Sequence, residues 1–148
     1  MSIIQSPEIE KAYEAVRDDK DDTNWMLLEY EGDRKDILKV AATGSGGLKE
    51  MVERFSPDQA AFAYVRVKVA NDELSQRVKF VLVPWCGPQV KVMRRAKLSV
   101  HIAEVKSVIK VFAIEVPASE KEDLKEEDII LKLKRAGGAN YDRQGSDY

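Results

Sequence analysis

The sequence has little of what disulfides, metal centres and most catalytic sites are built from. Its 148 residues include one cysteine and one histidine. A lone cysteine excludes an internal disulfide and fits a reducing compartment, and a lone histidine argues against most metal sites and histidine-based triads. We interpret Cys86 as a buried, inert thiol and His101 as a packed or surface residue. The sequence therefore predicts no enzyme, no metal and no cofactor.

Long hydrophobic runs are also missing. No window approaches the roughly 20 apolar residues of a membrane-spanning helix. The opening residues, MSIIQSPEIEKAYEAV, lack the basic and apolar regions of a signal peptide. We therefore expect a cytoplasmic protein without a transmembrane segment. A length of 148 residues suits one domain.

Positive charge is concentrated in one block of an otherwise acidic chain. Residues 76–110 hold eight lysines and arginines and one acid, Glu104, although the whole chain has a net charge of −2. This distribution favours a surface for an anionic partner, while solvated helix and strand ends are the simpler alternative. The overall acidity argues against nucleic acid, as does the expected burial of Phe80 and Trp85, which leaves few aromatic rings for base stacking.

Hydrophobic periodicity predicts nine elements. Ser6 and Pro7 mark the start of the first helix, and Gly32 lies in a hairpin loop. Ser119 and Glu122 have the spacing of a capping box for the last helix. The expected elements are helix 7–17, strands 25–31 and 37–44, helix 48–55, strands 60–70 and 76–83, helix 93–106, strand 109–116 and helix 119–136.

This order of elements is typical of an α/β domain of the α+β type. We expect a central mixed five-stranded sheet with helices on both faces. Strands 60–70 and 76–83 should be antiparallel neighbours, because the link between them is too short for a crossover helix. The domain is expected to span residues 1–137, with Gly137 ending the last helix. Residues 138–148 form a polar tail that we expect to be flexible.

Several stretches of the chain resemble one known family. They are YEAVRDD, FAYVRV, SQRVKFVLVPWCG, RRAK and, most specifically, KRAGGANYDRQ near the end. Together they make the chain similar to the coactosin branch of the actin-depolymerising-factor homology (ADF-H) family, to which cofilin also belongs. The resemblance runs over nearly the whole chain. It implies binding to filamentous actin without catalysis.

The resemblance also implies two binding surfaces, each rich in cations. One is the start of the long third helix. The other combines the base of the fourth strand with the end of the last helix. Actin is acidic, so a basic rim would steer and position it. The implied residues are Met93, Arg94, Arg95 and Lys97 on the first surface, and Arg77, Lys79, Lys134 and Arg135 on the second.

Two departures from the cofilin pattern bear on the activity. The segment before the first helix is short, and Arg94 and Arg95 stand where cofilin carries bulkier, less charged residues. Both argue against severing and against binding of actin monomers. The resemblance to coactosins implies a protein that binds filament sides and opposes capping rather than depolymerising filaments, and we expect it to be a monomer of the cytoplasm and cytoskeleton. The alternatives are cofilin-like severing with monomer binding, and a signalling adaptor whose basic face binds phosphoinositides.

Overall fold

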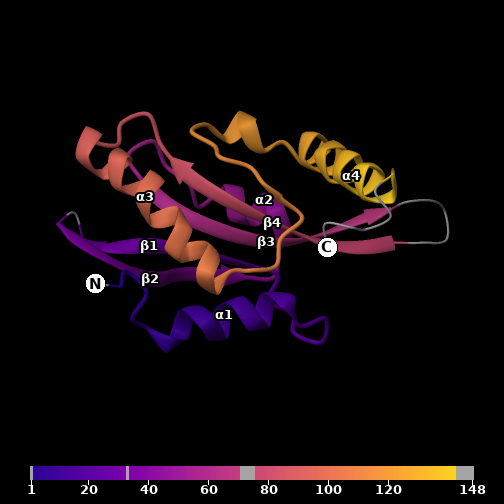
Figure 1. Cartoon of the computed structure of the whole chain (residues 1–148), viewed down its shortest axis with the longest axis horizontal. Coiled ribbons are helices and arrows are strands. Elements are labelled where there is room, and N and C mark those ends of the chain that lie inside the picture. The colour runs from indigo at the N-terminus through magenta and orange to yellow at the C-terminus, as the bar shows by residue number, and fades with distance from the viewer. Residues whose placement is uncertain (1, 33, 71–75, 143–148) are drawn as a thin grey trace.

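The computed structural model describes residues 2–32, 34–70 and 76–142 (Figure 1). Four α-helices, one short 3-10 helix and five strands follow one another along this part of the chain. They are α1 (Pro7–Arg17), β1 (Trp25–Gly32), β2 (Lys35–Gly44), α2 (Gly47–Val52), β3 (Ala60–Ala70), β4 (Gln76–Cys86), α3 (Val92–Val108), β5 (Ile114–Glu115), the 3-10 helix η1 (Lys121–Leu124) and α4 (Glu126–Asp142).

The five strands form one mixed sheet in the order β2-β1-β3-β4-β5. The first four strands are antiparallel to their neighbours, and β5 runs parallel to β4. β3 and β4 pair along their whole length, from Ala60 opposite Cys86 to Ala70 opposite Gln76. The predicted mixed five-stranded sheet and the antiparallel pairing of these two strands are therefore confirmed.

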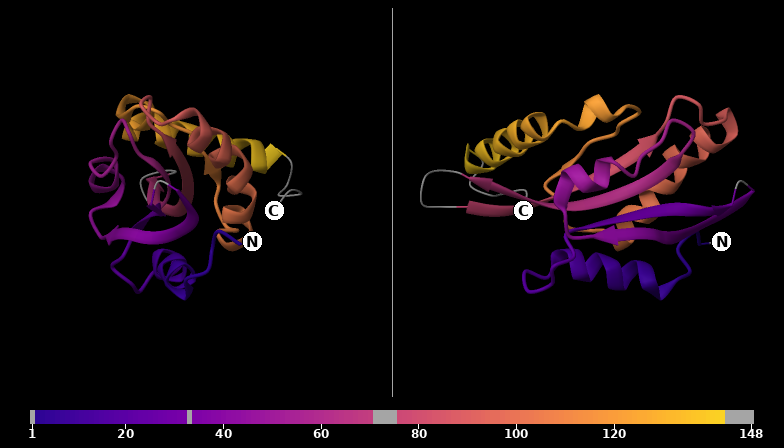
Figure 2. Two further views of the ribbon diagram at one scale, coloured as in Figure 1. Left: turned by 90° about the vertical axis from the view of Figure 1, so that its left-hand side faces the viewer. Right: turned by 180° about the vertical axis from the view of Figure 1, so that it is seen from behind.

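Side chains alternate between the two faces of the sheet, so the sheet builds two separate cores. On one face, Trp25, Val65 and Val83 pack with α2 and α4. On the other face, Phe62 and Tyr64 pack with α1 and α3, among other buried residues. Figures 1 and 2 show α4 and α1 on opposite sides of the sheet. The predicted helical layers on both faces are confirmed.

The first helix begins as its sequence predicts. Ser6 is the N-cap, and its hydroxyl accepts a hydrogen bond of 3.2 Å from the backbone N–H of Glu8. Pro7 occupies the first helical position, where a backbone N–H would have no partner inside the helix. The residues that this helix buries are Ile9, Tyr13 and Val16.

The predicted strand 109–116 is mostly wrong, because β5 holds only two residues. α3 continues to Val108, two residues beyond its expected end. The chain then runs beside β4, where backbone N–H groups of Ala113 and Ala118 donate to Phe80 and Pro84 at 2.7 and 3.0 Å. The N–H of Val116 donates to Leu82 at 2.9 Å between these two bonds, and the paired strand is confined to Ile114 and Glu115, with one isolated bridge at Ala118.

The predicted continuous helix 119–136 is also wrong. η1 is followed by an extended Lys125, and α4 begins only at Glu126. The break turns both Leu124 and Ile129 into the core. Five residues apart, these side chains would point about 140° away from each other on one straight helix.

The ends of this last segment differ from the prediction as well. The capping box joins Glu120 and Asp123, one residue after the predicted pair Ser119 and Glu122. α4 passes through Gly137 and ends at Asp142. Of the expected flexible tail, residues 138–142 thus belong to a helix, and residues 143–148 lie outside the described residues.

Candidate functional site

The start of β4 carries Arg77 and Lys79 on the face of the sheet that α4 covers. Alternate residues further along the strand, from Val81 to Trp85, are buried in the core of that face. Lys79 and Arg77, two and four residues before Val81, lie on the same face of the strand. The side chain of Lys79 is half-buried and that of Arg77 is exposed. The strand therefore presents two cations where its apolar core ends.

The end of α4 lies beside the same end of the β3–β4 hairpin (Figure 1). Lys134 and Arg135 are both exposed. The preceding residue, Leu133, is buried in the core on the α4 side of the sheet. Arg135 also lines a groove together with Lys132, one helical turn earlier. As neighbours in a helix, Lys134 and Arg135 point in different directions from α4.

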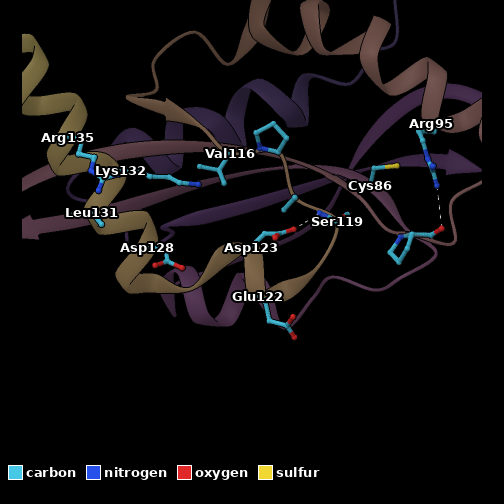
Figure 3. Close-up of a pocket in the computed structure, with 13 residues that line it drawn as sticks. Cys86, Arg95, Val116, Ser119, Glu122, Asp123, Asp128, Leu131, Lys132 and Arg135 are labelled. Carbon is cyan, nitrogen blue, oxygen red and sulfur yellow. Dashed lines mark hydrogen bonds between the residues drawn. The ribbon is translucent and has the colours of Figure 1, made fainter.

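The groove occupies about 920 Å³ between α4 and the start of α3 (Figure 3). Its walls carry three cations and three carboxylates, besides apolar side chains and the half-buried Cys86. Arg95 stands at the α3 end of the groove. The charged residues of the walls are Arg95, Lys132, Arg135, Glu122, Asp123 and Asp128.

Arg94, in the first turn of α3, points inward rather than toward solvent. Its side chain is 13% exposed and forms a 3.0 Å ion pair with Asp36 on β2. The guanidinium also donates to the carbonyl oxygens of Gly32 and Lys35 at 3.1 and 3.2 Å. Its central carbon lies 3.8 Å from the centre of the Tyr30 ring. The first turn of α3 is thereby joined to the β1–β2 hairpin.

The next cations of α3 are also engaged. Lys97 forms a 2.9 Å ion pair with the second oxygen of Asp36. Arg95 is exposed and donates to the carbonyl oxygens of Pro88 and Val90, at 3.4 and 3.1 Å, in the loop before the helix. The hydrogen bond from Lys97, with further bonds and charge from Arg94, lowers the pKa of Asp36 below its usual value.

Carboxylates from other parts of the chain neutralise part of the positive charge of residues 76–110 in the folded protein. Arg94 and Lys97 share Asp36, and Lys106 forms a 2.6 Å ion pair with Glu115. Among the described residues, Arg94, Lys97 and Lys106 of residues 76–110 are thus paired with carboxylates that lie outside the block. The net positive charge that this block offers to a partner is therefore smaller than the sequence alone indicates.

An exposed apolar strip on α3 was not predicted. Val92, Met93 and Val100 are 78%, 72% and 71% exposed. With the exposed Ala96 and Ala103 they follow the spacing of one helix face, and we call these five residues the apolar ridge. The opposite face holds Leu98 and Val105, which are buried.

The sequence held a signal for this ridge. The helix has more apolar residues than one buried stripe needs, and its many β-branched residues left the register ambiguous. The sequence alone does not show whether Val100 or Val105 faces the core. The structure separates them, since Val105 is buried and Val100 is exposed.

The single histidine is a packing residue of α3. His101 Nδ1 lies 2.7 Å from the hydroxyl oxygen of Tyr30, and the two rings are tilted with centres 5.6 Å apart. Burial raises the pKa of Tyr30 to about 12, against the opposing influence of Arg94. Tyr30 therefore stays neutral, with Arg94 over its ring and His101 at its hydroxyl.

Residues 2–4 are docked against α3 and the edge of β2. Ile3 is buried, and its carbonyl oxygen accepts a 2.8 Å hydrogen bond from the N–H of Leu38. The carboxylate of Glu104 on α3 accepts from the hydroxyl of Ser2 and from the N–H groups of Ile3 and Ile4, the last two at 3.2 and 3.4 Å.

A mixed five-stranded sheet between two pairs of helices, with an exposed long helix and a cationic strand base, defines an ADF-H domain. Residues 2–134 match the family described as cofilin/tropomyosin-type actin-binding protein. The chain therefore belongs to this family. Its members are actin-binding proteins rather than enzymes, which confirms the expectation that the chain is not an enzyme.

Within the family the chain is similar to coactosins. It is 41% identical to coactosin of Dictyostelium discoideum over 142 residues, which are 95% of each chain. The solution structure of mouse coactosin, described as an actin filament binding protein, superposes with a TM-score of 0.75 at 33% identity, covering 98% of this chain and 99% of the other. The chain also matches drebrin-like protein B of Xenopus laevis, 39% identical over 133 residues, or 90% of this chain, but spans only 34% of that longer protein. The resemblance to coactosins is confirmed.

Among the described residues, no helix is long and apolar enough to cross a membrane.

Proposed function

We propose that this protein is a monomeric cytoplasmic actin-binding protein that binds the sides of actin filaments without severing or depolymerising them, and thereby modulates their capping and dynamics. The observation that carries the proposal is the apolar ridge of α3, together with the cationic base of β4, on a domain of the cofilin/tropomyosin-type family. The residues that we assign to the interface are Met93, Arg95 and Lys97 on α3, Arg77 and Lys79 on β4, and Lys134 and Arg135 on α4, with Arg94 behind the α3 surface.

The apolar ridge has the properties of a helix that enters a partner's groove. Large exposed apolar side chains at helical spacing are disfavoured on a surface that only meets water, and they commonly mark an interaction site. Val92 and Met93 stand at the start of the helix, and Val100 lies two turns further on. The small side chains of Ala96, which lies between them, and of Ala103, which follows Val100, keep the ridge low enough for close backbone approach.

The two proposed surfaces lie at opposite ends of β4 (Figure 1). Lys79 is near the start of the strand, and α3 begins after its end. Seven residues separate Lys79 from Cys86, so at about 3.3 Å per residue the surfaces are on the order of 20 Å apart or more. A partner that contacts both surfaces must extend at least this far along the molecule.

The arrangement of residues 2–4 supports binding without severing. In the cofilin pattern the segment before the first helix helps to engage monomers. Here Ile3 is buried and Glu104 holds the backbone on either side of it, so residues 2–4 are committed to the protein's own α3. The mouse relative is described as a filament-binding protein, which agrees with this assignment.

Co-sedimentation and dilution assays test the proposal together. We expect the protein to pellet with actin filaments and to leave the rate of fluorescence loss unchanged when pyrene-labelled filaments are diluted. Failure to pellet would contradict filament binding. Pelleting with faster loss of fluorescence would instead place the protein with the severing members of the family.

A further inference from the structure

Arg94 is one of the residues that the family resemblance assigns to actin, yet its geometry is that of a buried clamp. Its partners among the described residues of the β1–β2 hairpin include the Asp36 carboxylate, the carbonyl oxygens of Gly32 and Lys35, and the ring of Tyr30. A guanidinium held flat on a ring and bonded along its edge has few donors left for a partner protein.

The start of α3 needs such a clamp. Its N-cap is Lys91, and within the described part of the chain no side chain caps its first turn. The first turn carries arginines and no acid, although the positive end of the helix dipole favours negative charge there. Asp36 brings a carboxylate to this end of the helix through 3.0 and 2.9 Å ion pairs with Arg94 and Lys97.

The clamp also fixes what the helix shows to the outside. Val92 and Met93 directly precede Arg94, so the inward turn of Arg94 directs them outward, where they are 78% and 72% exposed. We infer that Asp36 and Arg94 are positioning residues for filament binding, which hold the first turn of α3 so that the apolar ridge meets actin in one orientation. This inference rests on the proposed function.

Removing the Asp36 carboxylate should change filament affinity in opposite directions if Arg94 positions the helix and if Arg94 is a free cation for actin. If Arg94 and Lys97 met actin as free cations, removing the neighbouring acid would strengthen binding to an acidic partner. If Asp36 positions the helix, the same change weakens binding. We expect Asp36→Asn to weaken filament binding about fivefold, within the range that residues outside an interface commonly exert on binding.

Two further variants separate positioning from charge and from general damage. Arg94→Lys keeps the charge, but an ammonium cannot both pair with Asp36 and lie flat on Tyr30, so we expect a loss similar to that of Asp36→Asn. Glu31→Gln removes an acid that is exposed on the same hairpin, and we expect binding within about twofold of the parent.

Filament co-sedimentation of these variants is combined with hydrogen exchange of the free proteins. In Asp36→Asn we expect faster exchange of the amides of residues 95–98, with unchanged exchange in β3. Unchanged or tighter filament binding by Asp36→Asn, or parent-like binding by Arg94→Lys, would overturn the inference. Parent-like exchange at residues 95–98 would overturn the clamp itself. If the parent protein fails to pellet while the exchange result is as expected, the proposed function is wrong and the clamp stands.

Discussion

At the scale of single residues, Gly87 shows how closely the chain is packed where β4 ends. A Cβ atom at this position would lie 2.1 Å from the carbonyl oxygen of Pro57. The N–H groups of Gly87 and Gln89 donate to Gln59 and Pro57 at 3.0 and 2.8 Å. The glycine of the Pro-Trp-Cys-Gly stretch therefore lets two backbone segments touch, and this contact fixes the loop that leads into α3.

We expect Gly87→Ala to lower the free energy of unfolding by about 2 kcal/mol, because a rigid backbone must move to admit the methyl group. Gly32→Ala is the matched control, since no atom lies within 4 Å of a Cβ placed there. Urea denaturation of both variants measures the difference. Equal stabilities of the two variants would show that the loop at Pro57 yields freely and that the contact is unimportant.

At the scale of elements, Glu104 joins the N-terminal segment to α3. Hydrogen bonds from the hydroxyl of Ser2 and from the N–H groups of Ile3 and Ile4 hold the pKa of Glu104 below its usual value. A carboxyl whose pKa is lowered in the folded protein stabilises the fold at pH values above its pKa in the unfolded chain, which is about 4.3. That contribution is lost as the pH falls through the lower pKa of the folded state.

We therefore expect Glu104→Gln to be less stable than the parent at pH 7 and to approach it in stability as the pH falls through the lowered pKa of Glu104 in the folded parent, where the parent also loses the carboxylate. Thermal melts of both proteins across this range check the prediction. The exchange rate of the Leu38 amide, which bonds to Ile3, should rise in the variant at pH 7. A stability difference that stays the same as the pH falls would contradict the role of the charge.

The elements also show where the sequence is informative. Ser6 and Pro7 predicted the start of α1, because a cap is a local signal that adjacent residues define. The break at Lys125 was not predictable in this way, since it depends on Leu124 and Ile129 both reaching the core. Periodicity marked α3 as a helix but left its inner face open, because apolar residues lie on both of its sides.

In the candidate site, too, features set by neighbouring residues could be predicted, and features set by distant residues could not. Lys79 could be placed from its neighbours, because the buried residues that follow it fix the alternation of the strand. The inward direction of the Arg94 side chain could not be predicted from its neighbours, because its carboxylate partner Asp36 is 58 residues away in the sequence. Long-range pairs of this kind decide which cations of a basic block remain for a partner, and local patterns do not contain them.

At the scale of the whole molecule, the sheet separates the two proposed binding surfaces and connects them rigidly. β4 begins at one surface and leads directly to the other, with its central residues, among them Val81 and Val83, fully buried. A shift at one end cannot be absorbed by a flexible linker. Under the proposed function both surfaces fit the filament at the same time, so each should be necessary for tight binding.

The central claim is that the base of β4 contacts the filament, and a substitution of Lys79 tests it most directly. The residue is fixed by a strand whose next side chains are buried, so it loses little freedom on binding. Lys39→Ala is the matched control, because Lys39 is an exposed strand lysine on β2, at the opposite edge of the sheet.

The measurement is co-sedimentation of Lys79→Ala and Lys39→Ala with actin filaments, beside a thermal melt of each. We predict that Lys79→Ala weakens binding at least about tenfold, or about 1.4 kcal/mol, with a melting curve like that of the parent. Lys39→Ala should bind as the parent does. Parent-like pelleting of Lys79→Ala with a normal melt would contradict the account and leave α3 as the surface that binds the filament.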